Sequence, residues 1–296
     1  MIDVIETTQE SRKNKYRVLV CIDGSDESYR GLTAAARIAA APDVDIILLY
    51  VRPIDQGLRT GGLQVRVARE NMLDWGLELP GIQYLKKGRD MLINNDELVS
   101  QWDQESTHTD VAGDPLGDNT IEYTNSEGKS IVLKLKTASS VAGGVLDQFE
   151  LGPYDLIILG SSGSAGGFAK SLWDPAIAEK IAVHAPCSVC VTRELETEHG
   201  MLLCTDGSER ASEMIVKAAS LSKRVDAEVS VMSVALEQNQ QTEASEYVEK
   251  AGKLLSSQGV EPRRIFTEIG NPVEKIIEVG TDYSFIVLGD TGNTWP

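Results

Sequence analysis

The sequence has little of what membrane and secreted proteins need. None of its apolar runs approaches the roughly 18–20 residues of a membrane-spanning helix. Residues 1–15 form a polar tail of mixed charge without an apolar segment, so they do not have the pattern of a secretory signal. We therefore expect a cytoplasmic protein that does not bind membranes.

Cysteine and histidine are scarce, with four cysteines and three histidines among 296 residues. Cys187 and Cys190 have the C-x-x-C spacing, but they fall in an apolar run that predicts a strand, where residues three apart point to opposite faces. We therefore interpret them as packing residues rather than as a redox pair. The histidines stand in unlike contexts, and we expect no metal site.

Basic residues are outnumbered, because 28 lysines and arginines stand against 45 acidic residues and give a net charge of −17. This charge opposes binding to nucleic acids and to anionic membranes. It also makes a polyphosphate harder to hold. The rest of the composition, 42% hydrophobic and 25% charged, is ordinary for a globular protein, and the length predicts two domains.

Common catalytic motifs are absent as well. The chain has no Gly-x4-Gly-Lys-(Ser/Thr) loop, no Gly-x-Ser-x-Gly elbow and no paired carboxylates at a metal-binding spacing. We therefore assign no catalytic residue, and we expect no enzymatic activity beyond, at most, weak ATP hydrolysis.

What the sequence does contain is a duplicated pair of strand-and-turn segments. Residues 18–25, VLVCIDGS, recur at 201–208 as MLLCTDGS, and residues 154–163, YDLIILGSSG, recur at 283–292 as YSFIVLGDTG. Each segment is a short apolar run, typical of a buried strand, followed by a polar turn with glycine. The duplication predicts two copies of one domain, with ligands expected at the turns.

Apolar runs alternate with helix-forming segments in both copies, which predicts an α/β fold with a parallel sheet. We expect the first domain at 16–193 and the second at 200–296, joined by a charged linker at 194–199. The second copy has no counterpart of Pro175–Thr192, which would be its last helix and strand. Phe285–Leu288 would then be an uncovered edge strand, so we expect a homo-oligomer or a protein partner that covers it.

The first domain also carries an insert. From Asp23 to Gly160 there are 137 residues, but from Asp206 to Gly289 only 83, a difference of about 54 residues that falls within about 55–130. Asp110–Gly128, rich in turn-forming residues, predicts the turns of a hairpin or a flexible loop.

These features resemble the universal stress protein family in a tandem form. The resemblance rests on the Asp-Gly-Ser turns at 23–25 and 206–208, the Gly-x-x-Gly turns at 160–163 and 289–292, and the segment KIAVHAPCSVCV at 180–191. It implies two Rossmann-like domains with a five-stranded parallel sheet of order 3-2-1-4-5, the second lacking its last helix and strand, and a stress-response regulatory function. It also implies a ligand crevice beyond the carboxyl ends of the first and fourth strands.

In the nucleotide-binding branch of the family, the resemblance implies an aspartate that contacts adenine, a strand end beside the base, and a glycine turn at the ribose and phosphates. The residues at these positions are Asp23, Val51, Leu159, Gly160, Ser161, Ser162 and Gly163 in the first domain, and Asp206, Val234, Gly289 and Gly292 in the second. By the same placement, Leu288 would lie beside the sugar. A turn-forming role explains the two aspartates as well as a ligand role does.

The phosphate region departs from the family pattern Gly-x2-Gly-x9-Gly-(Ser/Thr). Trp173 and Asp174 stand where Gly-Ser is expected, and Asp174 before Pro175 predicts a helix cap whose charge repels phosphate. In the second domain, Asp290 brings an acid into the turn. We therefore expect binding of ATP or another adenine nucleotide to be weak or absent. A scaffold or interaction protein that binds no nucleotide is the alternative.

Overall fold

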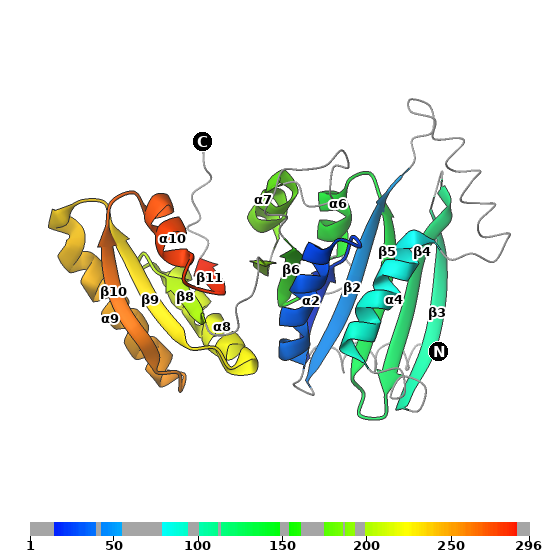
Figure 1. The fold of residues 1–296 in the computed structure, drawn as a ribbon, viewed down its shortest axis with the longest axis horizontal. Coiled ribbons are helices and arrows are strands. Elements are labelled where there is room, and N and C mark those ends of the chain that lie inside the picture. The colour runs from blue at the N-terminus through cyan, green and yellow to red at the C-terminus, as the bar shows by residue number, and fades with distance from the viewer. Residues whose placement is uncertain are drawn as a thin grey trace. The chain divides into compact units, whose positions relative to one another are not determined.

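The structure is a computed structural model, which describes residues 15–39, 43–54, 79–93, 101–111, 114–148, 154–160, 175–185, 187–192 and 199–288. The chain divides into two compact units, Met1–Arg193 (unit 1) and Glu194–Pro296 (unit 2). Figure 1 colours unit 1 from blue to green and unit 2 from yellow-green to red. Within the described residues, no helix is both long enough and apolar enough to cross a membrane.

Unit 1 alternates strands and helices around one sheet. Its elements are β1 (Tyr16–Cys21), α2 (Asp26–Ala39), β2 (Val44–Pro53), α4 (Pro80–Leu92), β3 (Trp102–Val111), β4 (Asp114–Asn125), β5 (Ser130–Ala138), α6 (Val141–Leu146), β6 (Leu156–Gly160), α7 (Pro175–His184) and β7 (Ser188–Thr192). The sheet has seven strands in the order β3-β4-β5-β2-β1-β6-β7.

The prediction of a five-stranded, all-parallel sheet is wrong for unit 1. Strands β5, β2, β1, β6 and β7 pair in parallel, but β4 pairs antiparallel with both β5 and β3. Within the described part of the insert, β3 and β4 form a hairpin that widens the sheet. Asp110–Gly128 was predicted as the turns of a hairpin or a flexible loop. Most of it is strand β4 of a hairpin, in which Ile121 and Tyr123 alternate with polar residues and Tyr123 is buried.

Helices cover both faces of the sheet in unit 1. An added Cβ at Gly81 of α4 would touch Tyr50 of β2, and one at Gly144 of α6 would touch the neighbouring Val51. Since successive strand residues point to opposite faces, α4 and α6 lie on opposite sides of the sheet. The apolar core follows from the strands, whose residues Val18, Leu19, Val20, Ile46, Ile47 and Leu48 are all buried.

Unit 2 has a smaller sheet. Its described elements are β8 (Met201–Cys204), α8 (Glu209–Val225), β9 (Val229–Ala235), the 3-10 helix η2 (Gln238–Gln240), α9 (Gln241–Ser257), β10 (Pro262–Ile269), α10 (Pro272–Gly280) and β11 (Phe285–Leu288). Four parallel strands have the order β10-β9-β8-β11, which follows that of β5-β2-β1-β6 in unit 1. Gly252 of α9 packs on Ile265 of β10, whereas Ile276 of α10 packs against the same apolar cluster as Phe266, the next residue of β10. Because successive strand residues point to opposite faces, α9 and α10 cover opposite faces of this sheet.

Candidate functional site

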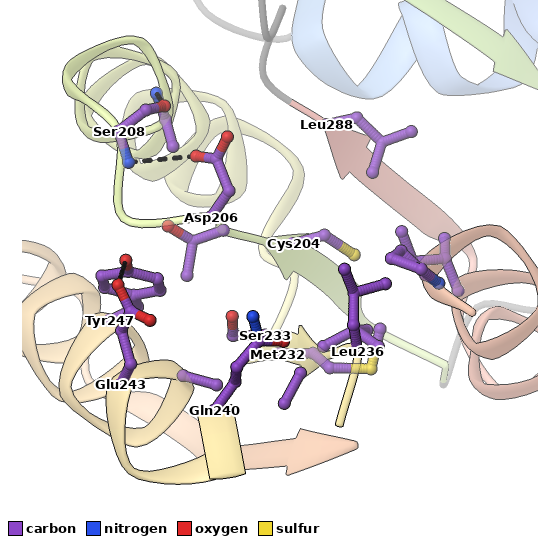
Figure 2. Close-up of a pocket in the computed structure, with 17 residues that line it drawn as sticks. Cys204, Asp206, Ser208, Met232, Ser233, Leu236, Gln240, Glu243, Tyr247 and Leu288 are labelled. Carbon is purple, nitrogen blue, oxygen red and sulfur yellow. Dashed lines mark hydrogen bonds between the residues drawn. The ribbon is translucent and has the colours of Figure 1, made fainter. Parts of the chain in front are cut away.

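A cavity of about 380 Å³ lies at the carboxyl ends of β8, β9 and β11 in unit 2. Strand β8 stands between β9 and β11, so connections leave neighbouring strands in opposite directions and a crevice opens between them. Figure 2 shows the 17 lining residues, which are Cys204, Thr205, Asp206, Ser208, Ala211, Met232, Ser233, Val234, Ala235, Leu236, Gln240, Glu243, Ala244, Tyr247, Pro272, Ile276 and Leu288.

The turn after β8 places Asp206 at this cavity. Its Oδ1 accepts a hydrogen bond from the Ser208 amide at 3.0 Å (Figure 2). Ser208 Oγ in turn accepts one from the Ala211 amide at 3.1 Å. In unit 1, Asp23 Oδ1 accepts from the Ser25 amide at 2.9 Å in the same way. Both aspartates therefore form the turn. Among the described residues, Asp206 Oδ2 has no hydrogen-bond partner, so it is available to a ligand.

An aromatic ring lies against the glycine of this turn in both units. Tyr247 of α9 contacts Gly207, and Tyr84 of α4 contacts Gly24 so closely that an added Cβ would lie 2.8 Å from the Tyr84 ring. The φ angles are +77° at Gly207 and +90° at Gly24. Glycine is therefore required at both positions by the backbone conformation and by the neighbouring ring.

Two acidic groups and a phenol meet on the α9 side of the cavity. The Tyr247 hydroxyl donates a hydrogen bond to the carboxylate of Glu243, one helical turn away (Figure 2). This hydrogen bond is the main cause that raises the pKa of Tyr247, and the negative charges of Glu243 and Asp206 add to it. The phenol is thus held in its neutral form, with its proton directed at Glu243.

The opposite wall is apolar. Cys204, Met232 and Ile276 belong to or pack against one hydrophobic cluster behind the cavity. Burial raises the pKa of the Cys204 thiol to about 12, so near neutral pH it contributes sulfur surface and not a nucleophilic thiolate.

The structure brings some predicted residues together and not others. Asp206 and Val234 line the cavity together with Leu288. Val51 and Leu159 of unit 1 lie in the buried core, and Gly160 is the buried last residue of β6. The predicted glycine turns and the substituted phosphate segment lie outside the described residues; they are Ser161, Ser162, Gly163, Trp173, Asp174, Gly289, Asp290 and Gly292.

The contribution of α9 was not predicted from the sequence. Gln240, Glu243 and Tyr247 all line the cavity, although Tyr247 follows its turn by 40 residues. The sequence feature that could have identified this part of the site is a tyrosine in the helix after the second strand of each copy. It was hidden because Tyr84 follows Gly24 by 60 residues in unit 1, where the insert intervenes.

The crevice of unit 1 differs on this same side. The rings of Tyr84 and Tyr50 have their centroids 5.9 Å apart with a tilt of 56°. Cys21 pairs with Leu49 in unit 1, and its counterpart Cys204 pairs with Met232 in unit 2. The next residues along these strands, Tyr50 and Ser233, are therefore equivalent. Unit 1 therefore has two aromatic rings where unit 2 has one ring and a serine at the edge of its cavity.

Comparisons with known proteins agree with this fold. A family model described as "Universal stress protein family" matches residues 16–193. A solved structure described as a universal stress protein from Pseudomonas aeruginosa UCBPP-PA14 is similar with a TM-score of 0.54 and 14% identity, over 96% of this chain and 86% of that one. One from Archaeoglobus fulgidus DSM 4304 has a TM-score of 0.49 and 13% identity, over 92% and 86%.

A search of curated proteins returned no match. The likeness to the Pseudomonas structure supports the fold alone, because the identity is low. The family model, however, spans more than half of the sequence, and on that ground the chain belongs to the universal stress protein family.

Proposed function

We propose that the chain is a tandem universal stress protein of the cytoplasm with a regulatory role in the stress response, and that unit 2 is the second copy of the domain. Three features support the second copy. The Asp-Gly-Ser turn is repeated, the strand order of unit 2 follows that of unit 1, and a tyrosine packs on the turn glycine in each.

The molecular activity in this proposal is the binding of an adenine-containing ligand in the cavity of unit 2. The observation that carries it is the 380 Å³ cavity at the carboxyl ends of β8, β9 and β11, with Asp206 at its edge. Asp206 Oδ2 can accept a hydrogen bond from the exocyclic amino group of adenine. Met232 and Val234 supply the apolar wall that a flat base needs.

Grip on the phosphates of ATP, ADP or AMP is weak in this proposal. In unit 1 the sequence places Trp173 and Asp174 in the position of the family's Gly-Ser. In unit 2 it places Asp290 two residues after the last strand. Acidic groups at an anion site repel phosphate oxygens. Asp23 holds the corresponding position in unit 1, where Tyr50 and Tyr84 form a different crevice wall, so this proposal places the adenine ligand in unit 2 alone.

Native mass spectrometry of the full chain tests the proposal, first as purified and then with added adenosine, AMP and ATP. We expect one adenine ligand per chain and its loss in Asp206→Asn. This substitution keeps an amide oxygen for the Ser208 amide but replaces the free acceptor with a donor. Asp23→Asn is the matched control in unit 1, and it should leave that ligand bound. A protein that binds none of the three ligands would contradict the proposal.

A scaffold function is the second candidate, and exposed apolar residues favour it. On α10, Val273 and Ile277 are 53% and 61% exposed, and on β11 Ile286 and Leu288 are 42% and 57% exposed. Residues of this kind on a helix and a neighbouring strand are typical of a surface that contacts another protein. A wild-type chain that stays empty with all three ligands but forms a stable oligomer or complex would favour this function.

A further inference from the structure

One wall of the crevice can be compared residue by residue between the two units. Tyr247 of unit 2 corresponds to Tyr84 of unit 1, because each ring packs on the glycine of its Asp-Gly-Ser turn. Ser233 corresponds to Tyr50 by strand register, and both Ser233 and Tyr247 line the cavity of unit 2. Unit 1 therefore has a phenol ring at a position where unit 2 has only a small side chain.

The helix that faces this wall differs by one methyl group. Three residues before the helical tyrosine, α4 has Gly81, whereas α9 has Ala244, which also lines the cavity. Both residues are buried, and one turn further along the helices the buried Leu85 matches the buried Val248. The burial of the two helices thus supports the alignment that their tyrosines give.

In unit 1 the ring of Tyr50 fills the space between strand and helix. An added Cβ at Gly81 would lie 2.5 Å from Cδ1 of Tyr50, so the ring rests directly on the helix and leaves no room for a side chain there. The centroid of the Tyr84 ring is 5.9 Å away with a tilt of 56°, which is a favourable arrangement for two aromatic rings. Tyr50 therefore shows that this wall can hold an aromatic ring.

Unit 2 keeps the wall but lacks the ring. Ser233, Ala244 and Tyr247 all line its cavity of about 380 Å³, so the place that Tyr50 takes in unit 1 belongs to the open space in unit 2. A cavity of about 150 Å³ holds a benzene ring, so this one has room for a larger heterocycle. Asp206 lies close enough for its charge to help raise the pKa of Tyr247, which puts a carboxylate near the same place.

We propose that the cavity of unit 2 contains a subsite for one planar aromatic ring, bounded by Ser233, Ala244 and the ring of Tyr247, and that Tyr50 takes this place in unit 1. The inference rests on the proposed function and deepens it, since it places the base of the adenine ligand in this subsite. The aspartate of the turn is common to both units and cannot distinguish them. The residue at the position of Ser233 is then the one that decides which unit binds.

4-Methylphenol, which is the tyrosine side chain as a free molecule, tests the subsite without assuming adenine. We expect it to bind the full chain in saturation-transfer NMR and to be displaced by adenosine. 4-Methylcyclohexanol has a similar size but is not planar, and it should give a signal at least about threefold weaker, because it cannot pack on the Tyr247 ring as a flat ring does.

Ser233→Tyr combined with Ala244→Gly places the residue pair of unit 1 in unit 2. We expect the 4-methylphenol signal to be lost and the affinity for adenosine and for ATP, measured by calorimetry, to fall at least about tenfold. The chain should stay folded in circular dichroism, because glycine makes room for the ring. Thr242→Tyr adds the same ring on the exposed side of α9, outside the cavity lining, and should change none of these results.

Tyr50→Ser is the reverse change. It removes the ring from unit 1 and should make the 4-methylphenol signal stronger than that of the wild type, because a second subsite becomes open. An unchanged signal would overturn the correspondence of the two crevices, and this holds even if the double variant of unit 2 does not fold.

The outcomes separate the subsite from the function on which it rests. Adenosine that binds without displacing 4-methylphenol, or that binds the double variant as tightly as the wild type, would overturn the subsite and leave adenine binding in place. A 4-methylphenol signal that persists in the folded double variant would overturn it as well. A chain that binds 4-methylphenol as expected but none of adenosine, AMP and ATP would overturn the proposed function and keep the subsite.

Discussion

Gly207 lies in the turn at the cavity, against the ring of the cavity-lining residue Tyr247. Its φ of +77° and the adjoining Tyr247 ring both exclude a side chain. We expect Gly207→Ala to lower the free energy of unfolding by about 2–4 kcal/mol, because the left-handed conformation and the displaced ring each add a cost. Urea unfolding of the full chain, followed by circular dichroism, measures it.

Gly259 provides the matched control for this prediction. Its φ is +72°, but the nearest atom to an added Cβ is the flexible end of Lys223, Nζ, at 3.3 Å. Gly259→Ala should therefore show only the backbone cost, about 1–2 kcal/mol. Tyr247→Ala combined with Gly207→Ala should recover the part of the loss due to the ring. Equal losses at Gly207 and Gly259 would show that the ring does not constrain the turn.

At the scale of elements, α8 begins at the wall of the cavity, so its cap joins stability to the site. Ser208 is the N-cap, and its Oγ accepts from the Ala211 amide. We expect Ser208→Ala to lower the free energy of unfolding by about 1 kcal/mol, because that amide loses its partner. Ser220→Ala, on the exposed side of the same helix, should have no such cost, since alanine has the higher helix propensity. Thermal unfolding of both variants compares them, and a loss that is equal at the two positions would contradict the capping role.

The elements also show which parts of the fold were predictable. The apolar runs of β1 and of its counterpart β8 identified the buried strands, because a parallel strand covered on both faces is apolar along its length. For hairpin β3–β4 the sequence left two alternatives open, the turns of a hairpin or a flexible loop, because its polar residues become a strand only when β5 offers an edge to pair with. That pairing is a tertiary effect that local sequence does not encode.

The same distinction applies to the site. Asp206 and Val234 were found because they stand at the ends of repeated strands, where the fold class alone locates a crevice. Glu243 and Tyr247 were missed because their part in the site depends on which face of α9 turns toward that crevice. The crevice of unit 1 differs through a single strand position, since Tyr50 of β2 stands where β9 has Ser233.

At the scale of the whole molecule, the apolar surface of α10 and β11 requires an explanation in a chain with a net charge of −17. Within residues 199–288, β11 pairs only with β8, so its other edge has no described strand beside it. Such an edge tends to pair with another chain. Mutual repulsion of acidic chains opposes this association and should weaken as salt is added.

We therefore expect sedimentation equilibrium to give a mass above the 32.1 kDa of one chain, with a larger associated fraction at higher salt. Ile277→Lys places a charge on α10 at a side chain that is already 61% exposed, so it should dissociate the oligomer without unfolding unit 2. Val216→Lys makes the same change on α8, at a side chain 39% exposed, and should leave the mass unchanged. A wild-type mass of one chain at every salt concentration would show that this surface does not join two copies. Dissociation by both variants would show that any added positive charge disrupts the oligomer, and would not assign the contact to α10.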